Sequence, residues 1–192
     1  ELPLRELFEA PTVAALAARI DERYRAKSNL SLPPIAPTDR GEPAPLSFAQ
    51  ERLWFFEQLV PNTDTYHIPV ALKLKGTLNV AALERSLLEV IRRHEALRTT
   101  FVLVNGQPKQ VIGPIPIQVL SIIDLGTLPQ GEQDAEVRQL ISMEARRPFE
   151  LARGPLLRVM LVRLSEEENV VLLVMHHIVS DGWSMGILTR EF

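Results

Sequence analysis

Two apolar segments constrain the fold more than any other feature of this sequence. They are "GPLLRVMLVRL" (154–164) and "NVVLLVMHH" (169–177), joined by a short acidic turn. Each is apolar on both faces of the strand that its length predicts. Strands of this kind lie in the middle of a sheet that helices cover on both sides. The two segments therefore predict adjacent central strands.

The rest of the main body alternates helical and extended patterns. Ser47 and Gln50 have the spacing of a capping box at a helix start, and Asn79 is an N-cap candidate for a second helix. The Asn105-Gly106 pair indicates a hairpin turn between two strands. The alternation predicts an α/β fold with helices on a mixed sheet. The expected strands are 66–76, 99–104, 107–112 and 116–125, and the expected helices are 48–59, 79–97, 130–147 and one from Trp183 onward.

Composition excludes several classes of function. The 192 residues carry a net charge of −3 with scattered basic residues, which argues against a nucleic acid or membrane-surface partner. The absence of cysteine excludes thiolate metal sites and thiol catalysis. It also fits a reducing cytosol, so we expect cytoplasmic localisation. The apolar run 170–175 is far shorter than a membrane-spanning helix requires.

The first part of the chain differs from the main body. Residues 1–27 predict a short helical segment, a break at Pro11 and an amphipathic helix. Residues 28–44 are rich in proline and predict a linker. Because the sequence starts at Glu1 and stops at Phe192 within a helical pattern, we expect it to be a piece of a longer protein.

The end of the last predicted strand carries the candidate chemistry. His176 and His177 are adjacent, and neighbouring side chains on a strand point to opposite faces, so a shared metal site is disfavoured. We expect one imidazole to face the interior and the other to emerge where α/β sheets open their crevices. Asp181 could accept backbone N–H groups or pair with an arginine, and Gly182 permits a sharp bend.

A neutral histidine is the obvious general base among these side chains. The residues alone leave a second interpretation open, in which both histidines are polar residues satisfied at a strand terminus. His94 is expected to be a packing residue or to make a buried hydrogen bond, because it continues the apolar stripe of the helix 79–97. His67 has no role that the sequence indicates.

The strand-end residues resemble a known family. His176–Gly182 is similar to the HHxxxDG signature of condensation domains in nonribosomal peptide synthetases. Residues 1–27 are similar to the last helices of a peptidyl carrier domain, and residues 45–192 to the N-terminal lobe of a condensation domain. Three further blocks resemble that family in the same order: "LSFAQERLWFFEQL" (46–59), "RHEALRTTF" (93–101) and "PFELARGPLLRVMLVRL" (148–164).

The resemblance implies a fold and a reaction. The fold would be a chloramphenicol acetyltransferase-like α/β lobe, a mixed β-sheet packed with helices, preceded by a short helical segment. The reaction would form a peptide bond between an aminoacyl or peptidyl thioester donor and an aminoacyl acceptor, and "DGWSMGIL" resembles domains that take L-configured donors. His177 would be the catalytic residue, as general base or as positioner of the amine. His176 would be structural, Asp181 would organise the loop with Arg98 as its candidate partner, and Gly182 would serve the turn.

The resemblance also implies partners. No cofactor would bind directly, and 4′-phosphopantetheine would be carried by the partner carrier domains. The partners would be upstream donor and downstream acceptor peptidyl carrier domains, an adenylation domain and the C-terminal condensation lobe of the same synthetase. Because that second lobe would supply half of the tunnel, we predict that this chain alone forms no peptide bond.

Two other functions remain open at this point. One is a coenzyme A-dependent acyltransferase of the HxxxD superfamily, and the other is a non-catalytic carrier-docking or epimerisation-type lobe. The doubled histidine and the carrier-like first segment argue against the acyltransferase.

Overall fold

The computed structural model describes residues 4–26 and 42–191. The chain divides into two compact units, Glu1–Asp39 and Arg40–Phe192. In the first unit, α1 (Leu4–Glu9) and α2 (Val13–Ala26) are the two helices that the sequence predicts, and the Thr12 hydroxyl accepts the Ala15 N–H at 3.2 Å. Their assignment to a carrier domain stays a prediction. The predicted linker 28–44 lies almost wholly outside the described residues.

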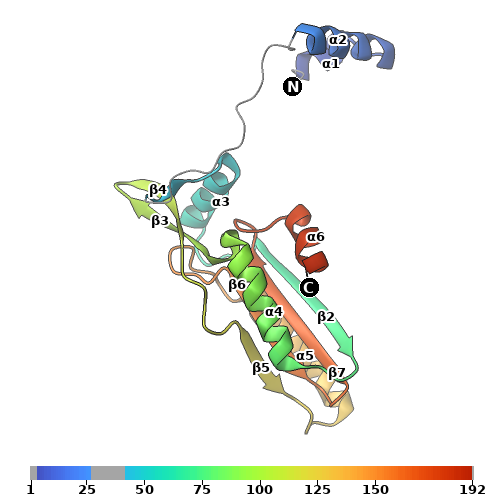
Figure 1. Cartoon of the computed structure of the whole chain (residues 1–192), viewed down its shortest axis with the longest axis vertical. Helices are drawn as coiled ribbons and strands as arrows, with labels where there is room; N and C mark the ends of the chain where they lie inside the picture. The colour runs from blue at the N-terminus through green and yellow to red at the C-terminus, as the bar shows by residue number, and fades with distance from the viewer. Residues whose placement is uncertain (1–3, 27–41, 192) are drawn as a thin grey trace. The chain divides into compact units, whose positions relative to one another are not determined.

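The second unit is built on a four-stranded mixed sheet in the order β2-β7-β6-β5 (Figure 1). Pairing is antiparallel between β2 and β7 and between β7 and β6, and parallel between β6 and β5. β6 and β7 are therefore the central strands, as their apolar pattern predicts. The strands are β2 (His67–Lys75), β5 (Leu120–Asp124), β6 (Leu157–Arg163) and β7 (Glu168–His176).

Each face of this sheet carries its own hydrophobic cluster, because successive side chains on β6 and β7 alternate between the two sides. On one face, Leu161 and Met175 pack with residues of α4 (Val80–Arg93). On the other, Val174 packs with Phe149 and with residues of α5 (Gln130–Arg146). The two helices thus cover opposite faces of the sheet (Figure 1).

A smaller sheet follows the predicted hairpin. Its order is β1-β4-β3, with β1 (Ala44–Pro45), β3 (Thr99–Val104) and β4 (Gln107–Ile112). Asn105 and Gly106 have φ angles of 53° and 78°, the left-handed pair that a two-residue hairpin turn requires.

The remaining described elements are three helices. α3 (Phe48–Leu59) opens with the predicted capping box, since Ser47 Oγ accepts the Gln50 N–H at 3.2 Å and Gln50 Oε1 accepts the Ser47 N–H at 2.9 Å. The 3-10 helix η1 (Glu95–Arg98) follows α4, and α6 (Gly182–Glu191) follows β7. Among the described residues, no helix combines the length and the apolar character that a bilayer crossing needs.

The two-faced core predicts a large cost for deleting central side chains. Leu161 is fully buried on β6, so Leu161→Ala should lower the free energy of unfolding by about 2–5 kcal/mol. The matched change Leu72→Ala on the edge strand β2, where the side chain is half exposed, should cost at most about 1 kcal/mol. Chemical denaturation of both variants measures the difference, and equal losses would contradict a core centred on β6 and β7.

Candidate active site

The turn after β7 presents His177 to solvent. β7 ends at His176, and the N–H of His177 donates to the Tyr66 carbonyl at 2.8 Å. The Val179 N–H then donates to the His176 carbonyl at 3.1 Å, which closes the turn. The His177 side chain is exposed, whereas His176 is buried. The strand end therefore separates the two imidazoles, one inside and one outside.

His176 is a neutral interior residue. Its side chain is 1% exposed, and its Nδ1 accepts the Ile178 N–H at 3.1 Å. Because Nδ1 accepts, the neutral ring carries its proton on Nε2. Burial lowers the pKa of His176 to about 4, and the nearby charges of His67 and His177 lower it further. The ring thus stays uncharged at neutral pH and shapes the turn that carries His177.

His177 lines a cavity of about 570 Å³ between the start of α3 and the strand-end turn. Tyr66, the cross-strand neighbour whose carbonyl binds His177, also contributes to the wall. The volume is within the range of small-molecule sites. The α3 side of the lining was not predicted as part of a site, although the block 46–59 resembles the family. The lining residues from α3 and its N-cap are Ser47, Ala49, Gln50, Arg52 and Leu53.

Asp181 caps α6 instead of pairing with an arginine. Its Oδ1 accepts the Ser184 N–H at 2.8 Å and the Ser184 hydroxyl at 2.6 Å. These hydrogen bonds lower the pKa of the exposed Asp181 carboxyl. Of the two roles that the sequence leaves for Asp181, the structure has the one with backbone N–H groups.

The predicted pairing of Arg98 with Asp181 is wrong. The Arg98 guanidinium donates to the Gly113 carbonyl and to Glu95 Oε1, so the local chain of η1 and the end of β4 occupies it. No arginine in the described part of the chain bonds to Asp181. Arg98 thus stabilises the connection between η1 and the segment after β4.

Gly182 is the first residue of α6, and its bend does not depend on glycine. A Cβ at this position would meet no atom within 4 Å, and the backbone is not left-handed. The interpretation of Gly182 as the residue that permits a sharp turn is therefore wrong for this structure.

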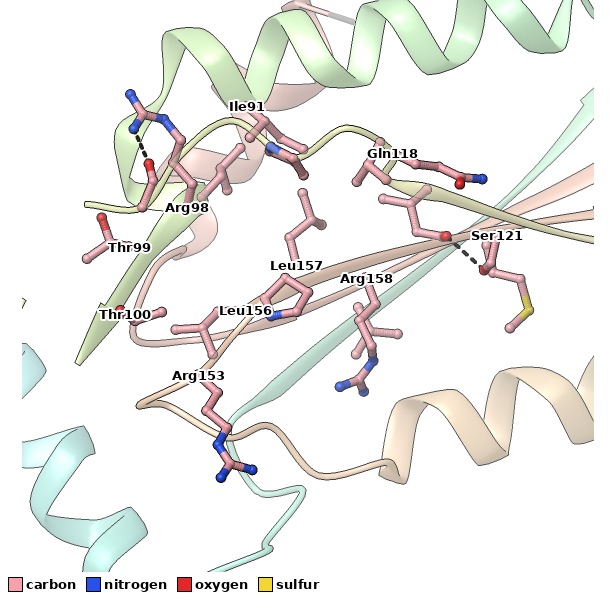
Figure 2. A pocket seen from close by; sticks show the side chains of 18 of the residues that line it. Ile91, Arg98, Thr99, Thr100, Gln118, Ser121, Arg153, Leu156, Leu157 and Arg158 are labelled. Atoms are coloured by element: carbon pink, nitrogen blue, oxygen red, sulfur yellow. Dashed lines mark hydrogen bonds between the residues drawn. The ribbon is translucent and has the colours of Figure 1, made fainter. Parts of the chain in front are cut away.

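A second cavity, of about 410 Å³, lies where β6 runs past the segment between β4 and β5. Its walls are mainly leucine, valine and proline side chains, and its three labelled arginines point in different directions (Figure 2). Arg158 is paired with Glu144, and Arg153 with Glu150. None of the described residues that line this cavity is a histidine. The cavity beside His177 is the better candidate for chemistry.

Comparison with known proteins agrees with the strand-end motif. Residues 41–192 match the family model described as the condensation domain. The chain belongs to the condensation domain family. It is 47% identical over 191 residues to a linear gramicidin synthase of Brevibacillus parabrevis and 41% identical to phosphinothricin tripeptide synthetase PhsB of Streptomyces viridochromogenes. The alignments cover 100% and 99% of this chain but 2% and 16% of those synthetases.

Solved condensation-domain structures share the fold. The starter condensation domain of rhizomide synthetase RzmA superposes with a TM-score of 0.72 at 25% identity, over 79% of this chain and 36% of that chain. The X-domain from teicoplanin biosynthesis gives a TM-score of 0.72 at 31% identity, over 83% of this chain and 33% of that chain. The α/β condensation-domain fold that the sequence predicts is therefore confirmed.

The state of His176 predicts a specific pH dependence of stability. The folded pKa is about 4 against an ordinary value of 6.5, so between these pH values the unfolded chain binds a proton that the folded chain excludes. The contribution of His176 to the free energy of unfolding should therefore fall by roughly 3 kcal/mol as the pH drops from 6.5 to 4.

His176→Asn tests this dependence, because the amide oxygen can still accept the Ile178 N–H but does not titrate. Denaturation curves between pH 7 and 4 should show a smaller loss of stability on acidification in the variant than in the unmodified chain. The same loss in both proteins would show that the buried ring is not held neutral.

Proposed function

We propose that this chain is part of a condensation domain that joins two carrier-bound thioesters through an amide bond. The observation that carries the proposal is the exposed imidazole of His177 at the wall of a cavity, on a turn fixed by a buried neutral His176. Family membership supports the same reaction, since the relatives are peptide synthetases.

The reaction is a transfer of an acyl group from sulfur to nitrogen. The neutral α-amine of the acceptor attacks the thioester carbonyl of the donor, a C–N bond forms and the C–S bond breaks. The attacking nitrogen loses a proton, and the departing thiolate takes one up to become a thiol. A neutral imidazole can accept the proton from nitrogen and return it to sulfur, and His177 is the imidazole that the cavity offers.

Much of the rate should come from positioning. Both reactants are tethered, and well-oriented partners gain several kcal/mol relative to free ones. His177 contributes either as the base or as the hydrogen-bond partner that orients the amine. The cavity can hold the reacting ends of two acyl groups between α3 and the turn, with the backbone of the turn fixed by the Tyr66 and His176 carbonyls.

The proposal extends to the partners of the intact synthetase. The chain spans 2% of the linear gramicidin synthase and 16% of PhsB, so most of such a protein lies outside it. We include donor and acceptor carrier domains that bear 4′-phosphopantetheine, an adenylation domain and a second condensation lobe. α1 and α2 are proposed as the end of the upstream carrier domain.

A coenzyme A-linked acyl donor is the second candidate substrate. A mutant of the RzmA starter domain was solved in complex with C8-CoA. A starter reaction in this chain's synthetase would use the same amine and the same imidazole, but its donor would be acyl coenzyme A instead of a carrier. Supplying each donor separately to the synthetase distinguishes the two.

Replacing His177 tests the proposal directly. In the synthetase that carries this chain, His177→Ala should lower the rate of amide formation from preloaded carriers by about 10²- to 10⁴-fold, because proton transfer and amine positioning are both lost. Circular dichroism should be unchanged, since the exposed side chain makes no core contact. Full activity in the folded variant would remove His177 from the reaction.

His177→Gln separates the two roles of the imidazole. Glutamine can hydrogen-bond to the amine but cannot accept its proton. Recovery of most of the rate in this variant, measured in the same single-turnover assay, would assign positioning to His177. A rate as low as that of His177→Ala would assign proton transfer.

A further inference from the structure

The C-terminal end of α5 is held by side chains from the two strands that flank β7. His67 on β2 donates its Nδ1–H to the Ala145 carbonyl at 2.7 Å. Arg158 on β6 donates to the carbonyls of Glu144 at 2.9 Å and Arg147 at 2.7 Å. The last carbonyls of a helix have no donor within the helix, so these bonds satisfy groups that would otherwise be left open.

The ring of Phe149, just after α5, joins these contacts to His176. His67 meets the ring edge to face, with centroids 4.9 Å apart and an interplanar angle of 83°. The Arg158 guanidinium lies 3.8 Å from the ring centroid, a cation–π distance. His176 contacts the same ring at 6.0 Å and 85°. Phe149 thus packs between His67, Arg158 and His176.

The register of the sheet places His67 directly opposite His176. The two are cross-strand partners, and their rings lie 6.1 Å apart. Arg158 is the partner of Val174, two residues before His176, so its side chain is on the same face. We call His67, Phe149 and Arg158 the roof, because together they cover the buried ring of His176.

The orientation of that ring determines the turn. Nδ1 of His176 must point at the Ile178 N–H to accept it, and a rotated ring would leave a buried donor without its partner. Tyr66, whose ring lies 6.4 Å from His176, borders the ring on the side of the cavity. The roof therefore restricts the ring from the α5 side while the Ile178 bond uses it on the other.

We propose that His67 is a positioning residue for His177, which acts through the roof by holding His176 in the orientation that shapes the turn. This inference rests on the proposed function of His177. The essential property of His67 is its Nδ1–H, which ties β2 to the end of α5. The side chain touches no reacting group, so it should affect the chemical step and leave the binding of both substrates unchanged.

Three variants of His67 test the inference. His67→Leu removes the donor but keeps apolar bulk, and His67→Asn places an amide N–H near the position of Nδ1. His67→Gln places its amide near the position of Nε2, where it cannot reach the Ala145 carbonyl in the same way. In the synthetase that carries this chain, we expect kcat to fall by about 10- to 100-fold in the Leu and Gln variants, with KM for both carriers unchanged. The Asn variant should recover to within about threefold of the unmodified enzyme.

A second readout does not depend on activity. The chain contains four histidines, so ¹⁵N-labelled imidazole signals can be assigned by single substitution. In the unmodified chain, His176 should show the neutral tautomer with its proton on Nε2. His67→Leu should broaden or shift this signal, and His67→Asn should restore it.

The outcomes separate this inference from the proposed function. If His177→Ala is fully active, the function proposed for His177 fails, whatever His67 does. If His177→Ala is inactive while His67→Leu keeps full kcat and an unchanged His176 signal, the role of His67 alone fails. Should the Leu variant not fold, equal kcat values in the Asn and Gln variants would likewise overturn it.

Discussion

The hydrogen bond from the Ile178 N–H to Nδ1 of His176 connects the core of this protein to its candidate chemistry. It forms inside a site from which water is excluded, so its acceptor has to be neutral, and burial keeps the pKa of His176 at about 4. A charged ring at this position would carry a proton on Nδ1 and could not accept. The hydrophobic packing that stabilises the sheet therefore also sets the protonation state on which the turn depends.

From this bond the rest of the site follows in order. The turn closes with the Val179 N–H on the His176 carbonyl, and Asp181 then starts α6 by capping it. His177 is left outside, beside the cavity that α3 completes. A rigid buried residue thus stands next to an exposed reactive one, since the sheet supplies the rigidity and the turn supplies the access. Preorganisation of this kind is what acyl transfer between two tethered groups requires.

Local patterns in the sequence predicted most of the fold. The apolar runs gave the two central strands, Asn105-Gly106 the hairpin, and Ser47 with Gln50 the start of α3. The site was only partly predictable, because its contacts join distant segments. Nothing near His67 indicates that it will bind the carbonyl of Ala145, 78 positions away. Arg98 and Asp181 lie in two family-like blocks, which suggested a pair, but each finds nearer partners in its own segment. His94 ends α4 as its C-cap and bonds to Glu191 Oε2 at 2.8 Å, where a helical stripe residue was expected.

Chemical modification of histidines tests the central claim most directly, because diethyl pyrocarbonate reacts with neutral imidazoles that solvent reaches. With the folded synthetase at neutral pH, we expect rapid modification of His177, protection of His176, and loss of condensation activity in step with His177 modification. Modification of His176 as fast as His177, or full modification of His177 with activity retained, would contradict this expectation.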